Sequence, residues 1–484
     1  MTQRLSASVI FVGGERLLTD ATISYDGGVI TDVATQTGDA VHNGGAVPAG
    51  TLVMPALINA HDHGRPSMTS FGAANMPLET WIARSAFGTP PDPYLAAAVS
   101  LARSARAGCG GVMMHYTRPS GTMTIVDEAI EIARAASDVG VRLAFALAVR
   151  DQNPLVYGDE TDLLATLPDD ARGTIAEMFV KAAPKPQDYL ERVDAIHAAI
   201  AGPMIDVQYG PAGVQWCSRV LLEAIAERSA ATGRRVHMHL LETIYQRQWA
   251  DRAFPGGMVR YLRDIGLLSD RLTLAHCVHA TPDELDMIAE AGATIVTNFS
   301  SNLHLHSGIG PIADAHRRGC KVAVGVDGLA LDEDDDALRE MRLVQIAHDG
   351  IGFDRTWSRA EFLALAVRNG RRSIGVAGSG TLMVGAAADF LVIDTAMLDR
   401  DAIMPVDPLD LLFARGNTSC IRDVVVDGRT ISRDGKPTSV DLDAMEIELR
   451  ALYRKNLPRY RDLQHAWKPF ESAVSQWFRT QGCC

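Results

Sequence analysis

The stretch that decides the fold is Leu52-Val53-Met54-Pro55-Ala56-Leu57-Ile58-Asn59-Ala60-His61-Asp62-His63, an apolar run that ends in two histidines one residue apart. In a β-strand the side chains at positions i and i+2 share a face, so His61 and His63 would project together from the end of the strand. Two imidazoles on one face can coordinate the same metal ion. Paired histidines also occur on solvated loops and in ordinary cores, so the remainder of the chain must discriminate between these readings.

The composition is that of a globular protein with a large core, since 47% of the 484 residues are hydrophobic and 22% are charged. The sequence contains no run of eighteen apolar residues and no signal-peptide pattern, which predicts a cytoplasmic protein without membrane contact. The seven cysteines form no CxxC pair, which argues against a disulfide framework and against a cysteine zinc site. A formal net charge of −13 without a basic cluster argues against nucleic-acid binding.

The chain divides by its pattern of apolar residues. An opening region of short alternating strands gives way to apolar β-type runs that alternate with amphipathic helical patterns, which is typical of a (β/α)8 TIM-like barrel of the α/β class. We predict the barrel at residues 58–377, with its first strand at about 52–60 and a helical insertion at 157–201. The predicted remainder is a small composite β-sandwich domain formed from both chain ends, 1–57 and 378–440, and a C-terminal helical extension at 441–484.

Candidate metal ligands fall at the carboxyl ends of predicted strands. The eight strands are expected at about 52–60, 111–115, 142–147, 204–209, 235–240, 272–276, 293–298 and 321–327. Their ends converge on one face of a barrel, which would bring together His61, His63, His239, His276 and Asp327. Imidazoles with a carboxylate suit one divalent ion, zinc first and iron or manganese as alternatives.

Such an ion would make a hydrolytic site. Metal ligation lowers the pKa of water from 15.7 to about 7 and so supplies hydroxide at neutral pH. Glu242 lies three residues beyond His239, where the strand gives way to a loop, and its carboxyl group could carry a proton to a leaving nitrogen. Asp327 could take the proton of the water while His276 hydrogen-bonds the nucleophile.

Five motifs together carry a family resemblance: 55–63, 239–243 (His-Leu-Leu-Glu-Thr), 274–279 (Leu-Ala-His-Cys-Val-His), 300–303 (Ser-Ser-Asn-Leu) and 325–328 (Gly-Val-Asp-Gly). The set resembles the amidohydrolase superfamily, and more closely its branch of cytosine, guanine and adenosyl-homocysteine deaminases and triazine hydrolases. The resemblance implies one metal ion held by His61, His63, His239 and Asp327, with His276 beside the bound water and Glu242 as proton shuttle. Binuclear branches use a carbamylated lysine at the end of the fourth strand; here that place holds Tyr209-Gly210-Pro211, which favours the mononuclear form.

Several positions have rivals. His237 shares a strand face with His239, although the spacing to Glu242 favours His239 as the ligand. His279 similarly competes with His276, and Asp327 before Gly328 could be an ordinary turn residue.

The substrate is expected to contact loops that match no pattern, at 113–118, 150–154 and 215–217. Candidate substrate-binding residues there and near other strand ends are His115, Gln152, Tyr209, Gln215, Trp216, His279, Asn302 and His304. Trp216 could stack on a planar substrate or simply pack against the inserted helices.

These features predict a metal-dependent hydrolase of C–N bonds other than peptide bonds, acting on a small molecule. The first reading is an aminohydrolase, or deaminase, of a planar N-heterocycle such as a purine, pterin, pyrimidine or triazine. A second reading places an acyclic urea, carbamate or thiocarbamate in the same site. A third is an inactive barrel that serves as a binding module, and the resemblance also implies a homodimer.

Overall fold

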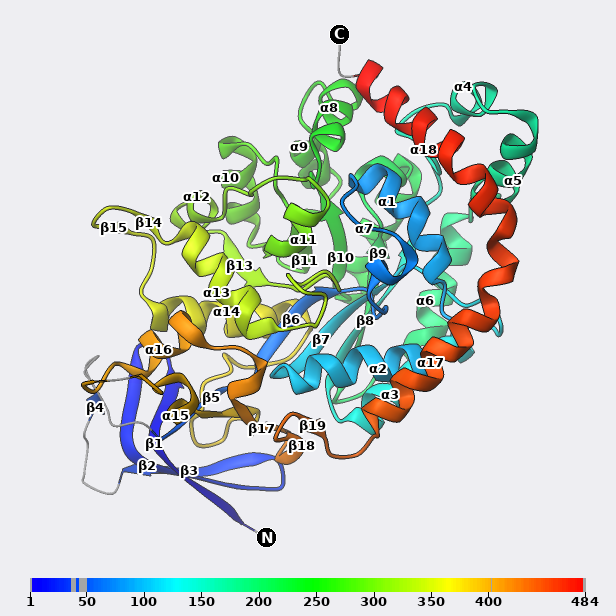
Figure 1. Ribbon diagram of the computed structural model, residues 1–484. Coiled ribbons are helices and arrows are strands. Elements are labelled where there is room, and N and C mark those ends of the chain that lie inside the picture. The colour runs from blue at the N-terminus through cyan, green and yellow to red at the C-terminus, as the bar shows by residue number, and fades with distance from the viewer. Residues whose placement is uncertain (1, 36–40, 43–49, 402, 482–484) are drawn as a thin grey trace.

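Two sheets organise the protein (Figure 1). The computed structural model describes residues 2–35, 41–42, 50–401 and 403–481. An eight-stranded parallel sheet curls into a nearly closed barrel with helices around it, and a nine-stranded sheet from both ends of the chain lies beside it. The predicted fold, a TIM-like barrel with a small composite domain, is confirmed.

The barrel strands follow one another in chain order. They are β6 (Leu57–Asp62), β7 (Cys109–Tyr116), β8 (Arg142–Val149), β9 (Ile205–Pro211), β10 (Val236–Leu240), β11 (Leu272–His276), β12 (Thr294–Thr297) and β13 (Lys321–Val324). Nearly all of their residues are buried, as expected for parallel strands covered on both faces. All eight strands overlap the runs predicted from the sequence.

Helices connect these strands on the outside of the barrel. They include α2 (Pro93–Arg106), α3 (Ile125–Val139), α6 (Pro186–Ile200), α7 (Arg219–Thr232), α8 (Ile244–Ala253), α9 (Met258–Asp264), α10 (Pro282–Ala291), α12 (Ile312–Arg317), α13 (Ala337–His348) and α14 (Arg359–Ser373). α10 shows how their starts are encoded, because Thr281 and Glu284 form a reciprocal capping box in front of its first turn.

The small sheet joins the two chain ends. It contains β1 (Gln3–Gly13), β2 (Arg16–Asp26), β3 (Val29–Thr35), β4 (Val41–His42), β5 (Thr51–Pro55), β16 (Phe390–Asp394), β17 (Ile421–Val426), β18 (Arg429–Arg433) and β19 (Lys436–Pro437). β5 pairs in parallel with β1 and antiparallel with β16, which links the N-terminal and C-terminal parts of the sheet.

The predicted first strand at about 52–60 is in fact two strands. The apolar run is continuous, but its hydrogen-bond partners change at Ala56, whose N–H donates to the carbonyl of Asp389 in the small domain (3.1 Å). The next N–H, that of Leu57, donates to the carbonyl of Gly108 at the barrel (3.0 Å). β5 therefore belongs to the small sheet and β6 begins the barrel.

Helices from two distant regions meet beside the barrel mouth. The segment 157–201 contains α4 (Glu160–Ala165), α5 (Asp169–Phe179) and α6, and the C-terminal part contains α17 (Leu442–Asn456) and α18 (Arg461–Gln481). Phe470 of α18 stacks on Phe179 of α5 with ring centres 6.0 Å apart, and Figure 1 shows α18 running along α5. The domain boundaries stated above stay predictions.

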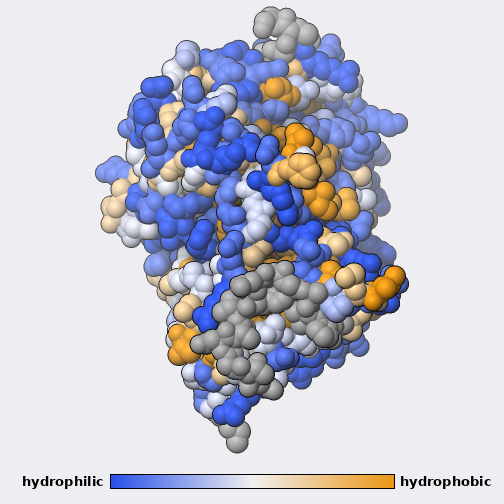
Figure 2. All heavy atoms as spheres, turned by 90° about the vertical axis from the view of Figure 1, so that its left-hand side faces the viewer, coloured by the Kyte–Doolittle hydropathy of each residue, from blue (hydrophilic) through white to orange (hydrophobic). Residues whose placement is uncertain are grey.

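Hydrophilic side chains cover most of the face seen in Figure 2, and hydrophobic ones gather there in small separate groups. In the described parts of the chain, no helix combines the length and the apolarity needed to cross a membrane.

Candidate metal centre and active site

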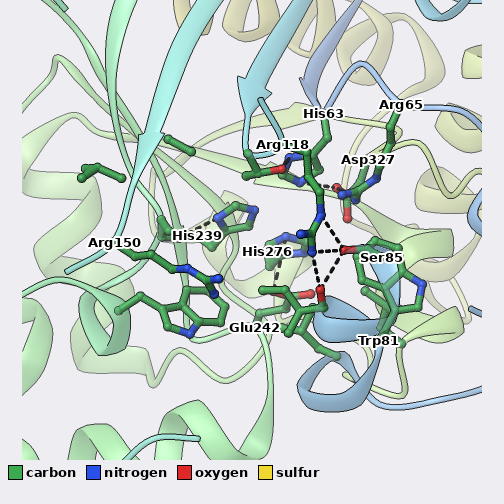
Figure 3. Close-up of a pocket in the computed structure, with 18 residues that line it drawn as sticks. His63, Arg65, Trp81, Ser85, Arg118, Arg150, His239, Glu242, His276 and Asp327 are labelled. Carbon is green, nitrogen blue, oxygen red and sulfur yellow. Dashed lines mark hydrogen bonds and ion pairs between the residues drawn. The ribbon is translucent and has the colours of Figure 1, made fainter. Parts of the chain in front are cut away.

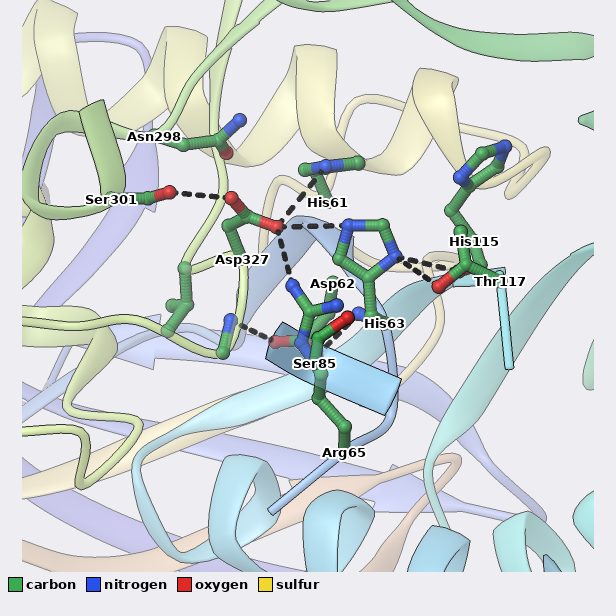
Figure 4. Close-up of polar contacts among 12 residues, drawn as sticks. His61, Asp62, His63, Arg65, Ser85, His115, Thr117, Asn298, Ser301 and Asp327 are labelled. Carbon is green, nitrogen blue, oxygen red and sulfur yellow. Dashed lines mark hydrogen bonds and ion pairs between the residues drawn. The ribbon is translucent and has the colours of Figure 1, made fainter. Parts of the chain in front are cut away.

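The five predicted strand-end residues lie together at the barrel mouth. Ligand atoms of His61, His63 and His239 lie within 4.8 Å of one another, and the same holds for His61, His276 and Asp327. Nε2 of His63 is 3.0 Å and Nε2 of His61 is 3.4 Å from Oδ1 of Asp327 (Figure 4). All five side chains are buried, so the barrel encloses a cluster of four imidazoles and one carboxylate.

Hydrogen bonds at Nδ1 fix the orientation of three of these rings. Nδ1 of His63 donates to the carbonyl of His115 (2.8 Å), and Nδ1 of His239 donates to the carbonyl of Ala212 (2.7 Å). Nδ1 of His276 lies 2.8 Å from the amide oxygen of Asn302. Because each acceptor requires the proton on Nδ1, each Nε2 keeps its lone pair for a ligand.

His61 is oriented by another histidine. Its Nδ1 lies 2.7 Å from Nε2 of His237, and the two rings are stacked. His237 is therefore placed to support His61 from behind, while His239 faces the cluster. The choice of His239 over His237 as the ligand, made from the spacing to Glu242, stays a prediction.

The backbone at two strand ends adopts the left-handed conformation. φ is 75° at His276 and 58° at Asp327, values that side-chain-bearing residues adopt only at a cost. The Ser301 hydroxyl donates to Oδ2 of Asp327 (2.5 Å), which leaves Oδ1 toward the histidines.

The donor set fits a divalent ion. Nε2 of His61, Nε2 of His276 and Oδ1 of Asp327 are buried without a hydrogen-bond partner among the described residues. An unsatisfied buried polar atom costs about 1–3 kcal/mol, so three of them in one place indicate a missing ligand. A cation that takes nitrogen and oxygen donors would satisfy all three.

The pKa shifts of His61, His239 and Asp327 favour the protonation states that metal ligation needs. Burial lowers the pKa of His61 to about 3. Burial, together with repulsion from neighbouring imidazoles, holds the pKa of His239 well below its usual range. Burial alone would raise the pKa of Asp327, but its contacts with His61 and His63 outweigh burial and hold that pKa well below its usual range. Burial thus favours the neutral form of His61 and His239, and the contacts of Asp327 favour its charged form.

The pKa of Glu242 is shifted in the opposite direction from that of Asp327. Burial, followed by repulsion from Asp327 and Glu79, raises its pKa well above the usual range for a glutamate. Its Oε2 lies 3.7 Å from Nε2 of His276, and its N–H donates to the side-chain oxygen of Gln246 (2.8 Å). The protonated form of Glu242 is therefore favoured beside the cluster.

A cavity of about 130 Å³ opens onto the cluster (Figure 3). Its apolar wall includes Leu78, Trp81, Ile82, Trp216 and Leu305, and its polar wall includes Arg65, Arg118, Arg150, Glu242 and Asp327. Trp81 and Ile82 lie on α1 (Leu78–Arg84), and Trp216 ends the short 3-10 helix η3 (Val214–Trp216). The cavity joins flat apolar surfaces to proton-transfer groups.

Only one of the predicted substrate-binding residues, Trp216, lines this cavity. Gln152 donates to the carbonyls of Gln215 and Cys217, so it braces the loop that carries Trp216. Tyr209 contacts Arg234 through its hydroxyl (2.8 Å). The others are placed as follows: His115 binds the carbonyl of Gly210, Gln215 is buried, His279 binds the carbonyl of Ser307, Asn302 orients His276, and His304 contacts the carbonyl of Leu331.

Sequence reasoning placed Arg118 and Arg150 in loops expected to contact the substrate, at 113–118 and 150–154, but did not name the arginine side chains of the cavity as candidates. Arg118 lies two residues after β7 and Arg150 directly after β8, so the strand-end rule that selected His61 also points to them. Arg65 lies two residues beyond His63. The search for metal ligands passed over these cationic side chains.

Comparison with known proteins agrees with this geometry. The sequence profile of the amidohydrolase family matches residues 52–431. The chain is 25% identical to 5-methylthioadenosine/S-adenosylhomocysteine deaminase of Acetivibrio thermocellus, over 84% of this chain and 87% of that protein. It is 27% identical to 5'-deoxyadenosine deaminase of Methanothermobacter thermautotrophicus, over 80% of this chain and 83% of that protein.

Two solved structures share the fold over nearly their whole length. Atrazine chlorohydrolase of Arthrobacter aurescens, complexed with zinc, has a TM-score of 0.74 at 24% identity, covering 92% of this chain and 98% of its own. An adenosine deaminase of Xanthomonas campestris with bound zinc has a TM-score of 0.76 at 22% identity, covering 94% and 98%.

Proposed function

Because the chain belongs to the amidohydrolase family, whose profile spans residues 52–431, we propose that it is a metal-dependent aminohydrolase of a planar N-heterocycle. The observation that carries this proposal is the buried cluster of His61, His63, His239, His276 and Asp327 at the floor of a cavity with tryptophan walls. Relatives named as deaminases of adenosine-type compounds support the same reaction class.

We assign His61, His63, His239 and Asp327 as ligands of a single divalent ion. A set of three imidazoles and one carboxylate suits zinc, and the two solved relatives described above contain zinc. When bound, such an ion lowers the pKa of a water molecule to about 7 and so makes a nucleophile available.

Asp327 and Glu242 carry out different proton transfers in the proposed reaction. The charged carboxylate of Asp327 accepts a proton from the attacking water, and Nε2 of His276 hydrogen-bonds that water. The proton that Asp327 accepts passes to the ring nitrogen that gains the electron pair of the attacked C=N bond. The protonated Glu242 delivers its proton to the leaving amino group, and the hydroxyl proton returns to Glu242 as ammonia departs and the ring carbon becomes a carbonyl. Trp81 and Trp216 of the cavity wall pack against the planar ring and exclude water from it.

Ammonia release tests the proposal. The metal-loaded protein is mixed with aminated purines, pterins, pyrimidines and triazines, and ammonia is measured with a coupled assay. Turnover of at least one compound is expected, with a loss of about 10²–10⁴-fold in Glu242→Gln. If the protein releases an amine and carbon dioxide from an acyclic urea or carbamate, the substrate is acyclic and the proposal of a ring substrate is wrong. If a fully metal-loaded protein releases no product from any compound, the result favours an inactive barrel that serves as a binding module.

A further inference from the structure

Three guanidinium groups line the cavity, and only one of them has an acidic partner among the described residues. Nη2 of Arg65 lies 3.7 Å from Oδ1 of Asp327, and its guanidinium lies 4.5 Å from the centre of the Trp81 ring. Arg118 and Arg150 form no ion pair with any residue in the described ranges. Two positive charges in the cavity wall are therefore uncompensated.

The donors of these two groups are largely free for a ligand. Nε of Arg118 donates to Oγ of Ser85 (3.1 Å), and its Nη2 contacts Ser85 and the carbonyl of Ile82, which leaves Nη1 without a described partner. The Arg150 guanidinium makes no hydrogen bond to the described part of the protein, and Figure 3 shows it reaching toward the cavity beside His239. A guanidinium presents five N–H donors, so most of this donor capacity is unused.

The two charges also repel each other. Burial, then repulsion from Arg150 and Arg65, lowers the pKa of Arg118 to about 9. Burial likewise lowers the pKa of Arg150. Cations kept together at such a cost in a cavity are typical of a site that receives an anion, because a carboxylate would accept the free N–H groups and remove the repulsion.

The size of the cavity suits a compact anion. A dry cavity of 150 Å³ in another protein holds one benzene molecule, and the cavity here measures about 130 Å³. One aromatic ring with a compact substituent fits such a space. A carboxylate attached directly to the ring suits both the volume and the planar guanidinium groups.

We propose that the substrate is a single aminated ring bearing a carboxylate, and that Arg118 and Arg150 bind this carboxylate. The inference rests on the proposed function, since it concerns the substrate of the same site. The carboxylate faces the two arginines, while the amino-bearing carbon faces Glu242 and the metal ligands. Arg118 and Arg150 are therefore specificity determinants rather than ligands of the metal.

Matched compounds test the proposal through activity. Cytosine and cytosine-5-carboxylate, and other aminated pyrimidines with and without a ring carboxylate, are compared by kcat/KM. Charged hydrogen bonds contribute enough to predict a preference for the carboxylate of about 10–100-fold. Arg150→Gln should remove most of that preference by raising KM, and Arg192→Gln on the exposed face of α6 is the matched control that should retain it.

Binding to the metal-free protein gives an independent readout. Calorimetric titration with orotate, a ring carboxylate without an amino group, is expected to show binding that Arg150→Gln weakens about 10–100-fold and that uracil does not reproduce. Arg118→Gln is tested in parallel with its thermal unfolding, because Arg118 also anchors Ser85.

The outcomes separate this inference from the proposed function. Equal turnover of neutral and carboxylated rings would overturn the inference and leave the aminohydrolase intact. Arginine-dependent orotate binding without ammonia from any compound would uphold the inference and overturn the aminohydrolase. Inorganic phosphate that binds the metal-free protein more tightly than orotate would overturn the choice of carboxylate.

Discussion

The N–H of Asp327 donates a hydrogen bond to the carbonyl oxygen of His61 at 2.9 Å. This contact joins Asp327, three residues beyond the eighth barrel strand β13, to the end of the first strand β6, and it sets the Asp327 carboxylate beside two imidazoles. The same backbone contact therefore closes the barrel and brings the proposed metal ligands together.

Asp327→Asn keeps this backbone contact and removes the charge. We expect the variant to fold, to hold less metal, and to lose about 10²–10⁴-fold in ammonia release, because both a ligand and a proton acceptor are lost. Metal content by mass spectrometry and kcat/KM test this. Ser301→Ala, which deletes only the hydrogen bond to Oδ2, should have a much smaller effect; wild-type activity in Asp327→Asn would contradict the assigned role.

His237→Ala should weaken metal binding without touching a ligand. His237 lies behind His61 at 2.7 Å, and loss of a residue that orients a metal-binding histidine typically costs 10–100-fold in affinity. Competition with a chromogenic chelator measures the change. His197→Ala, at an exposed position of α6, is the control, and an unchanged affinity in His237→Ala would show that His61 needs no support.

Glu340 of α13 makes stability depend on pH. It accepts hydrogen bonds from the N–H and hydroxyl of Ser300, in the helix α11 (Phe299–His304) that also carries Ser301 and Asn302. Burial raises the pKa of Glu340 from 4.5 to about 7. The folded state thus binds the proton more tightly, so its contribution is complete below pH 4.5 and is lost as pH rises through 7.

Relative to Glu340→Gln, the wild-type free energy of unfolding should therefore fall by a value on the order of 3 kcal/mol across this range. Urea unfolding at a series of pH values between 4.5 and 7.5 measures the difference. The prediction fails if the two proteins show parallel pH profiles.

Phe470→Ala should loosen α18 from α5. The side chain is 1% exposed and stacks on Phe179, and truncation of a buried phenylalanine costs about 3–5 kcal/mol. Faster hydrogen exchange is expected in α18 and α5, with the metal-binding histidines still protected. The substitution Lys468→Ala at a neighbouring exposed position should leave exchange unchanged; uniform exchange across the whole molecule would instead indicate global unfolding.

The barrel and the clustering of the histidines with Asp327 could be predicted because both follow from local patterns. Apolar runs of strand length mark all eight strands. Polar residues at the ends of these strands must converge in a barrel, so the sequence alone predicted that His61 and Asp327 lie close together. The boundary between β5 and β6 at Ala56 could not be predicted from the apolar pattern, because the residues stay apolar across it while their hydrogen-bond partners change. The homodimer and the exclusion of nucleic acid stay predictions.

The residues that line the cavity were harder to predict, because the lining depends on the direction in which each side chain points. Tyr209 follows the strand-end pattern, yet its hydroxyl meets Arg234 instead of the cavity. Trp81 lies on α1, far from any strand end, and reaches the cavity only through the packing of that helix. Such directions are set by tertiary contacts between segments that are distant in sequence.

The pairing of β5 with β16 has a consequence for synthesis on the ribosome. β5 leaves the ribosome before any barrel strand, but the partner that completes its hydrogen bonding is made only after all of them. At a translation rate of about 5–20 residues per second, β5 waits on the order of tens of seconds with one edge unpaired. During that time the exposed edge invites pairing with other chains, so nascent-chain chaperones would protect this protein before the small sheet closes.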